Sequence, residues 1–251
     1  MGSDIVALIL AGGEGSRLRP LSYYFQKCMI PIGSRQKPLL EYIIRNLKKH
    51  SLRDILIAVG YKAEQIINYF RDGNEYSLNI RYVHDSPDLK GTGGSLLNIF
   101  RGGYLQEYNT ILIHYGDILS NIDLSHMLKN YRESGADVMV ALSSKYQLPV
   151  GVARVDEENT IVSFEEKPSI NIYVSIGIVI LNSKVLADLN RLATDMRSLD
   201  IMSDFIPYLI KSKRMVKAYI TDSFWYDVGS IEKYEKLTNE LVERYLADLE
   251  K

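Results

Sequence analysis

Short apolar segments alternate with amphipathic segments through the first 142 residues of this 251-residue chain. The apolar segments lack polar alternation, which is typical of strands buried on both faces, and the amphipathic ones have helical spacing. Expected strands are Ile5–Leu10, Asp54–Val59, Ile80–Val83, Thr110–Ile113 and Asp137–Leu142; expected helices are Pro38–Lys49, Ala63–Phe70, one from about Ser95, and Leu124–Glu133. The alternation predicts an α/β fold, with a mostly parallel, Rossmann-like sheet between helices on both faces.

The second half of the chain changes character. Turn-forming residues separate two short apolar runs, which predicts a hairpin, and strands outnumber helices in the rest of the chain. We expect a hairpin of Gly151–Val155 with Ile161–Phe164, strands Ile172–Leu181 and Val216–Ile220, a helix capped by Ser183 that runs to about Leu192, and helices Ile201–Ile210 and Ile231–Leu249. No linker or internal repeat interrupts residues 4–251, so we expect a single domain with a smaller β-rich insertion.

Composition and charge exclude several classes of protein. The formal net charge is −1 and no long run carries one sign, which argues against a nucleic-acid partner. Cys28 is the only cysteine, so the chain forms no internal disulfide and no Cys-rich zinc site, and a cytoplasmic location is expected. The apolar run Ile5–Ala11 is too short to cross a bilayer, and no membrane association is expected.

A glycine-rich turn directly follows the first expected strand. The segment reads Leu10-Ala11-Gly12-Gly13-Glu14-Gly15-Ser16-Arg17. Glycines allow the backbone to approach a ligand closely and to present N–H groups to phosphate oxygens, and Arg17 adds a planar cation suited to phosphate. Arginine stands where the dinucleotide fingerprint requires its third glycine, and no Gly-Lys-Ser/Thr follows, so neither a hydride-transferring Rossmann enzyme nor a P-loop is indicated.

Four more motifs follow in order along the chain. They are Gly91-Thr92-Gly93-Gly94, Gly116-Asp117-Ile118-Leu119, Glu165-Glu166-Lys167-Pro168 and Trp225-Tyr226-Asp227-Val228-Gly229-Ser230. Asp117 comes just after a buried strand, and ligands of open α/β sheets bind at that end of the strands. A carboxylate there is suited to Mg²⁺, which also binds phosphates.

Together these motifs, with Lys27 in Phe25-Gln26-Lys27-Cys28-Met29-Ile30-Pro31, resemble the signature of sugar-1-phosphate nucleotidylyltransferases from Leu10 to Ser230. The resemblance implies a GT-A-like nucleotidyltransferase fold, with a nucleotide-binding half at about 4–142, a sugar-binding half at about 143–230 and a C-terminal helix at 231–249. It also implies transfer of a nucleotidyl group from a nucleoside triphosphate to a sugar 1-phosphate, with release of pyrophosphate.

Residue roles follow from the resemblance. Arg17 is expected to grip the outer phosphates and Lys27 the α-phosphate, with Mg²⁺ on Asp117 and Asp227. The remaining expected contacts are Leu10, Ala11, Gly12, Gly13, Gly15, Asp85, Gly91 and Thr92 for the nucleotide, and Gly151, Glu166, Lys167 and Ser175 for the sugar phosphate.

The chain departs from the family pattern at a few positions. Gln26 and Cys28 stand where prolines are common, which suggests a loop of different stiffness. Val150 replaces an aromatic residue and Ser175 an asparagine, which suggests altered sugar recognition. Ser230 either completes the metal motif or caps the last helix.

Two other functions are also consistent with the sequence. A choline-phosphate cytidylyltransferase of similar fold would use aromatic residues to hold its substrate, and the chain has 18 tyrosines. A non-catalytic subunit that senses a nucleotide sugar would need only the fold. Among transferases, the mannose- and heptose-type guanylyltransferases look closest and the glucose-type thymidylyl- and uridylyltransferases fit as well; the last helix is a candidate interface for a homo-oligomer.

Overall fold

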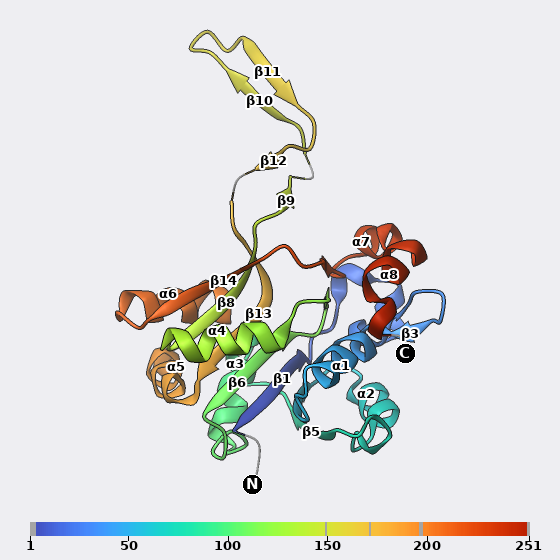
Figure 1. Ribbon diagram of the computed structural model, residues 1–251, viewed down its shortest axis with the longest axis vertical. Helices are drawn as coiled ribbons and strands as arrows, with labels where there is room; N and C mark the ends of the chain where they lie inside the picture. The colour runs from blue at the N-terminus through green and yellow to red at the C-terminus, as the bar shows by residue number, and fades with distance from the viewer. Residues whose placement is uncertain (1–3, 149, 171, 196–197, 250–251) are drawn as a thin grey trace.

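The computed structural model describes residues 4–148, 150–170, 172–195 and 198–249, which are built around one seven-stranded sheet (Figure 1). In sheet order the strands are β14 (Val216–Thr221), β8 (Val138–Ser143), β13 (Val174–Asn182), β6 (Thr110–Tyr115), β1 (Ile5–Ala11), β4 (Asp54–Val59) and β5 (Asn79–His84). Only β13 runs antiparallel to its neighbours in this sheet. The predicted mostly parallel α/β sheet is therefore confirmed.

Helices cover both faces of the sheet, because alternate side chains of each buried strand enter different apolar layers. Ile5, Ala7 and Ile9 of β1 belong to one buried cluster, whereas the intervening residues of β1 belong to the other. The first cluster includes α1 (Leu39–Lys49), α2 (Ala63–Phe70), α4 (Leu124–Ser134) and α8 (Asn239–Leu246), and the second includes α3 (Gly91–Arg101), α5 (Leu186–Leu192) and α6 (Ile206–Lys211).

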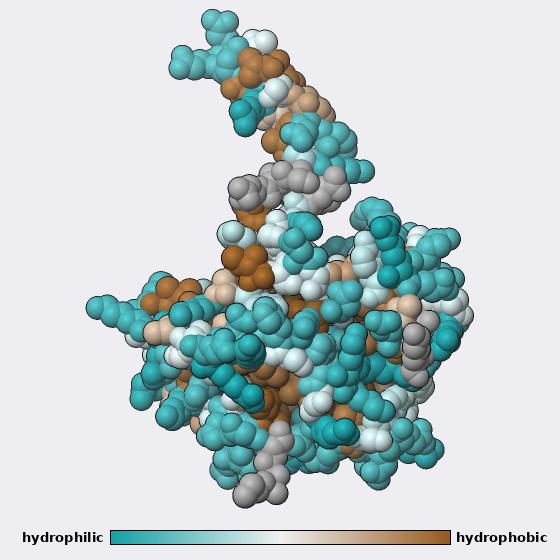
Figure 2. Space-filling model, in the orientation of Figure 1, coloured by the Kyte–Doolittle hydropathy of each residue, from teal (hydrophilic) through white to brown (hydrophobic). Residues whose placement is uncertain are grey.

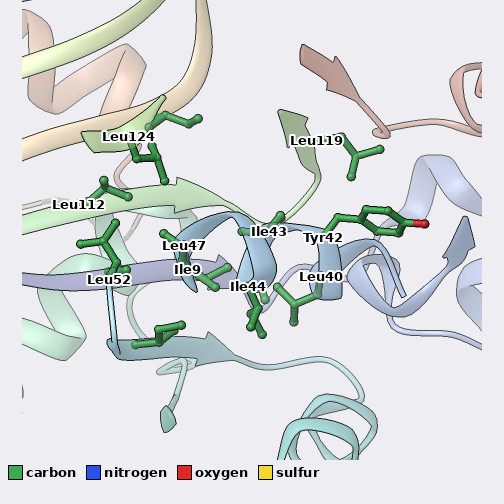
Figure 3. Packing of buried hydrophobic residues seen from close by; sticks show 14 of the residues in the cluster. Ile9, Leu40, Tyr42, Ile43, Ile44, Leu47, Leu52, Leu112, Leu119 and Leu124 are labelled. Atoms are coloured by element: carbon green, nitrogen blue, oxygen red, sulfur yellow. The ribbon is translucent and has the colours of Figure 1, made fainter. Parts of the chain in front are cut away.

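Figure 3 shows the first layer, where leucines and isoleucines of α1 pack over Ile9 and Leu112 of the sheet. Each such side chain, fully buried, contributes about 1.5–3 kcal/mol. This packing fixes α1 against the sheet and gives the loops at its carboxyl edge a rigid base.

Helix α3 begins at Gly91, ahead of the expected start at Ser95. Gly91 has φ of 82°, and a Cβ there would lie 2.4 Å from the Leu199 carbonyl oxygen. That oxygen accepts hydrogen bonds from the N–H groups of Gly93 and Gly94, at 2.8 and 3.1 Å. A distant segment of the chain thus stabilises a first turn whose glycines have low helix propensity.

Two boundaries around β13 also differ from expectation. The strand begins at Val174, not Ile172, and its pairing with β8 shifts register between Ser175 and Val179. Gly177 lies inside that shift with φ of 70°, a conformation that favours glycine. Asn182 rather than Ser183 caps the following 3₁₀ turn η5 (Ser183–Val185), which leads into α5.

The helical segment before β14 begins as a π-helical turn, η7 (Ile201–Phe205), and continues as α6. The Asp200 side chain caps this turn by accepting hydrogen bonds from the N–H groups of Met202 and Ser203. The predicted helix over Ile201–Ile210 is confirmed, with Pro207 inside the first turn of α6, where its missing N–H is tolerated.

The predicted single C-terminal helix is wrong. Residues 231–249 form three pieces: α7 (Ile231–Lys236), α8 and the 3₁₀ turn η8 (Ala247–Leu249). Leu237 leaves the helical conformation with ψ of 83° and is buried in the core, and Thr238 then caps α8 by accepting from the Leu241 N–H. The apolar pattern predicted helix but not the break, which depends on this cap and on the burial of Leu237.

The predicted hairpin is confirmed, and it stands well away from the sheet (Figure 1). Its strands β10 (Val152–Val155) and β11 (Ile161–Glu165) are joined to the body through a two-residue ladder of β9 (Tyr146–Gln147) with β12 (Ser169–Ile170). We call the described residues of 144–173 the arm. Figure 2 shows apolar surface along the arm. The exposed apolar residues of the arm include Val152, Val155, Ile161, Val162 and Phe164.

Candidate functional site

A cleft of about 1000 Å³ opens at the carboxyl edge of the sheet. The neighbouring parallel strands β1 and β6 end there. From β1 the chain continues to β4 and from β6 to β8, and these two strands lie on opposite sides of the pair in the strand order. Such a point is where ligands bind in open α/β sheets. The lining includes Leu10, Gly12, Gly13, Arg17, Lys27, Asp85, Gly91, Thr92, Asp117, Ser175 and Asp227, so most of the residues predicted from the sequence meet in one cleft.

The glycine turn after β1 is held close to its neighbours. The Gly12 carbonyl accepts from the Tyr61 N–H at 3.0 Å, and Gly15 has φ of 64° before the 3₁₀ turn η1 (Ser16–Leu18). A Cβ at Gly15 would lie 2.8 Å from the Lys27 Cβ, whereas one at Gly13 would make only an ordinary contact with the same side chain. The turn therefore needs glycine at position 15, where it touches Lys27, but not at position 13.

Lys27 and Asp117 form an ion pair across the cleft, with Nζ 2.7 Å from Oδ2. Lys27 begins the turn η3 (Lys27–Met29), and Asp117 follows β6 after Gly116, whose N–H donates to the Leu10 carbonyl at 3.0 Å. Burial alone would lower the pKa of Lys27, but the Asp117 carboxylate outweighs burial and the pKa lies above the usual value. The ammonium is therefore protonated at neutral pH.

Gln26 positions Lys27, and sequence reasoning missed this role. Its buried side chain donates from Nε2 to the Ala11 carbonyl at 2.5 Å and accepts from the Cys28 N–H. Its own N–H donates to Gln65 at 2.6 Å. The lysine loop is thus attached directly to the end of β1, and the departure from proline at position 26 has a physical reason.

Asp117 and Asp227 are brought together by the short ladder of β7 (Ile118–Ser120) with β15 (Trp225–Asp227). Ile118 pairs with Asp227, and the Val228 N–H donates to the Asp117 carbonyl at 2.9 Å. The Asp227 carboxylate also pairs with Lys233 of α7, a contact that the sequence did not suggest. Ser230 caps α7 by accepting from the Lys233 N–H, which settles its role.

Arg17 lies near Asp227. A Cβ at Gly229 would lie 2.7 Å from Asp227 Oδ1 and 3.3 Å from an Arg17 terminal nitrogen, so the guanidinium passes close to the backbone here. Within the described ranges its side chain makes no ion pair. An exposed cation that faces the cleft without an acidic partner is available to an anionic ligand.

Thr92 reaches the cleft, but its hydroxyl is engaged. It donates to Asp200 Oδ2 at 2.7 Å and accepts from the Ile201 N–H at 2.9 Å. Burial raises the pKa of Asp200, but the Thr92 hydroxyl and the N–H groups of its cap outweigh burial and lower it below the usual value. Thr92 thus fixes the segment before η7 against α3.

His114 is structural. The imidazole is buried in β6 with Nδ1 2.8 Å from the Tyr115 carbonyl, and burial lowers its pKa to about 4. Burial likewise raises the pKa of the Cys28 thiol to about 12, so this cysteine is not a nucleophile at neutral pH.

The other predicted sugar-phosphate residues lie on the arm. Gly151, Glu166 and Lys167 are not among the residues that line the cleft, whereas Ser175 at the start of β13 is. Gly151 and Glu166 are neighbours, since a Cβ at Gly151 would lie 2.8 Å from Glu166 Oε2. The structure therefore brings the nucleotide and metal residues together but holds the Glu-Lys motif apart from them.

A sequence profile described as nucleotidyl transferase matches residues 6–244. The chain belongs to the nucleotidyl transferase family. A UTP–glucose-1-phosphate uridylyltransferase of Synechocystis sp. is 29% identical over 258 residues, 97% of this chain and 65% of that protein. A glucose-1-phosphate adenylyltransferase of Methylobacillus flagellatus is 31% identical over 274 residues, 95% of this chain and 63% of that protein. The chain thus spans somewhat less than two thirds of the length of these curated relatives.

Solved structures of nucleotidyl transferases share the fold. A structure described as a glucose-1-phosphate thymidylyltransferase of Bacillus anthracis, in complex with sucrose, superposes with a TM-score of 0.75. The two sequences are 23% identical, and the match covers 94% of each chain. The GT-A-like fold predicted from the motifs is confirmed. Among the helices of the described residues, none combines the length and apolar character needed to cross a bilayer.

Mg²⁺, the metal implied for nucleotidyl transferases, fits the donor set of this cleft. The two carboxylates of Asp117, just before β7, and Asp227, at the end of β15, are hard oxygen ligands held close together by the pairing of these strands. No group of three or more acidic, histidine or cysteine residues suited to a metal occurs in the part of the chain that is described. Mg²⁺ is commonly held by one or two carboxylates together with water and substrate phosphates, and this site offers that arrangement.

Proposed function

We propose that this nucleotidyl transferase catalyses the reaction of a nucleoside triphosphate with a sugar 1-phosphate to give a nucleotide sugar and pyrophosphate. The observation that carries the proposal is the Lys27–Asp117 ion pair at 2.7 Å, placed at the open end of the glycine turn and beside Asp227. A protonated lysine, a free arginine and two carboxylates at one point suit phosphoryl chemistry, which depends on positioning and on charge neutralisation.

Each charged group of the cleft would hold a different part of the substrates. N–H groups of Gly12–Gly15 and the guanidinium of Arg17 would hold the β- and γ-phosphates, which become the leaving pyrophosphate. Lys27 would exchange its contact with Asp117 for the α-phosphate and neutralise charge that builds up there. When bound, Mg²⁺ would supply further charge neutralisation and a common anchor for both phosphate groups.

The nucleophile needs no general base in this proposal. A phosphate oxygen of the sugar 1-phosphate is already anionic, so it attacks the α-phosphorus in line, and the bond from the α-phosphorus to the bridging oxygen breaks. No proton is transferred in the step. His114 is buried and neutral because of its low pKa, so it is not placed to act as a base, and the proposed step requires none.

The arm would bind the sugar 1-phosphate. Glu166 and Lys167 are suited to sugar hydroxyls and to the sugar phosphate, and their use requires the arm to lie nearer to the cleft than in this structure. A lysine between two phosphate groups would offset their mutual repulsion.

A pyrophosphate-release screen tests the proposal. GTP, dTTP, UTP, CTP and ATP are each combined with mannose, glucose, galactose and N-acetylglucosamine 1-phosphates, with Mg²⁺ or with EDTA. We expect release from one or a few pairs, abolished by EDTA. If folded protein binds a nucleotide sugar yet releases no pyrophosphate from any pair, the chain is a sensor and the proposal is wrong.

A further inference from the structure

Asp85 holds a carboxylate in a fixed position on the wall of the cleft. Its N–H donates to the Val59 carbonyl at 2.8 Å, which extends the pairing of β4 with β5 by one residue. On its side chain, Oδ1 accepts from the Ser95 hydroxyl at 2.6 Å. A Cβ at Gly12 would lie only 1.7 Å from Oδ2, so the carboxylate lies directly against the glycine turn. Both sides of the group are thus fixed before any ligand binds.

This carboxylate has spare capacity to accept hydrogen bonds. In the described ranges, the Ser95 hydroxyl is the one side chain that donates to it, and neither lysine nor arginine pairs with it. Burial raises the pKa of Asp85, although the Ser95 hydroxyl and the neighbouring His84 lower it, as expected for a half-buried acid. An ionised carboxylate has about four lone-pair sites. A ligand that brings two N–H donors would satisfy the group.

The surroundings of Asp85 suit a flat nucleobase. Pro87 and Leu89 line the same cleft and add apolar surface to the loop that carries Asp85. The Leu89 backbone lies against Gly94, next to Ser95, where a Cβ on the glycine would clash at 2.7 Å. The glycine turn and this loop therefore lie on two sides of the carboxylate. The ion pair of Lys27 with Asp117 lies in the part of the cleft that would hold the phosphates.

The common nucleobases differ in the donors that they offer to a carboxylate. Guanine presents N1–H and the 2-amino group side by side, so it can donate two parallel hydrogen bonds. Adenine and cytosine present one amino group beside an acceptor nitrogen, and uracil and thymine present one N–H between two carbonyl oxygens that would repel the carboxylate. Two parallel hydrogen bonds to an ionised acceptor are among the strongest in proteins.

We propose, on the basis of the function proposed above, that the nucleotide substrate is a guanine nucleotide and that Asp85 reads its N1–H and 2-amino group. Ser95 acts as a positioning residue that holds Oδ1, and Gly12 permits the close approach of Oδ2. Specificity for the base then depends on the Asp85 side chain, because the N–H groups of the glycine turn contact phosphates that all nucleoside triphosphates share.

The wild-type enzyme gives the first test, because it requires no variant to fold. We expect kcat/KM to be highest for GTP among the five common triphosphates. ITP lacks only the 2-amino group, and we expect its kcat/KM to be at least ~10-fold lower than that of GTP, the effect of losing one of two paired contacts. Equal rates with GTP and ITP, or a preference for another base, would overturn the inference.

Asp85→Asn gives the second test. An amide presents one acceptor and one donor, which suits xanthine, whose N1–H lies beside a 2-carbonyl oxygen. We expect the ratio of kcat/KM for GTP to that for XTP to fall at least ~100-fold and to invert. Asp88→Asn is the matched control: the same change on the same loop, at an exposed carboxylate that does not line the cleft, should leave the ratio unchanged.

The outcomes separate the inference from the function on which it rests. If the enzyme prefers UTP, dTTP, CTP or ATP, the proposed nucleotidyl transfer is still supported, but Asp85 does not recognise guanine. An Asp85→Asn enzyme that still prefers GTP over XTP would do the same. Failure of every triphosphate with every sugar phosphate would instead count against the proposed function.

Discussion

Nζ of Lys27 lies 2.7 Å from Oδ2 of Asp117, although the two residues are 90 positions apart along the chain. The turn η3 and the loop after β6 meet here because both are fastened to the end of β1. Gln26 donates to the Ala11 carbonyl, and the Gly116 N–H donates to the Leu10 carbonyl. The end of β1 therefore sets the geometry of the charged pair.

Removal of either charge in this pair should abolish most of the activity. We expect Lys27→Ala and Asp117→Ala each to lower kcat at least ~100-fold, or about 2.7 kcal/mol. The first removes a cation from the reacting phosphates, and the second removes a carboxylate that would hold Mg²⁺. Steady-state pyrophosphate release with the best substrate pair measures this. Lys49→Ala is the control, since Lys49 is an exposed lysine paired with Asp248 outside the cleft. A decrease below about tenfold (~1.4 kcal/mol) would remove these two residues from the chemistry.

Gln26→Ala should lower stability more than a surface change does. It leaves the buried Ala11 carbonyl and the Cys28 N–H without their partner, and an unsatisfied buried group costs about 1–3 kcal/mol. We therefore expect the free energy of unfolding from urea denaturation to fall by about 2–5 kcal/mol. Gln106→Ala, at an exposed glutamine, should change it by less than about 0.5 kcal/mol. Equal effects of the two substitutions would show that the Gln26 contacts contribute nothing to stability.

Folding stability should decrease in mild acid because of His114. Its pKa is about 4 in the folded protein and near 6.5 when unfolded, so between these values the unfolded chain binds a proton that the folded protein does not. The contribution is complete above pH 6.5 and is lost as the pH falls toward 4, a total of about 3 kcal/mol. Urea titrations at several pH values measure the slope. His114→Asn should flatten it and exposed His126→Asn should not; an unchanged slope in His114→Asn would contradict the assignment.

Residues of the arm should affect the sugar phosphate and not the nucleotide. We expect Lys167→Ala to raise KM for the sugar 1-phosphate at least ~10-fold, the loss of one charge-assisted contact, with KM for the triphosphate within a factor of about two. Initial rates with each substrate varied in turn provide both constants. Glu157→Ala, in the exposed turn of the same hairpin, is the control. A parallel rise in both KM values in Lys167→Ala would place Lys167 on the nucleotide instead.

Elements with strong local patterns could be predicted from the sequence. Strand Asp54–Val59 and helix Ala63–Phe70 occur as expected. A continuous apolar run fits a strand buried on both faces, and apolar residues at helical spacing fit a helix packed on the sheet. The order of motifs also indicated which strand ends would meet, and the cleft contains Arg17, Lys27, Asp117 and Asp227 together.

Features that depend on distant contacts could not be predicted. The start of α3 at Gly91 is stabilised by the Leu199 carbonyl, and the end of α7 by burial of Leu237. The role of Gln26 depends on a carbonyl group 15 residues away. Each is a tertiary contact between residues whose local sequence carries no sign of the partner.

The arm leaves the sheet after β8 and returns to it at β13, and these two strands are neighbours that pair antiparallel. The entry and exit points are therefore held by the sheet itself, whatever lies between them. A segment attached in this way can be lengthened, shortened or exchanged as a cassette without disturbing the glycine turn or the two carboxylates. Under the function proposed above, recombination at this pair of strands would combine the same phosphate chemistry with a different sugar-binding segment.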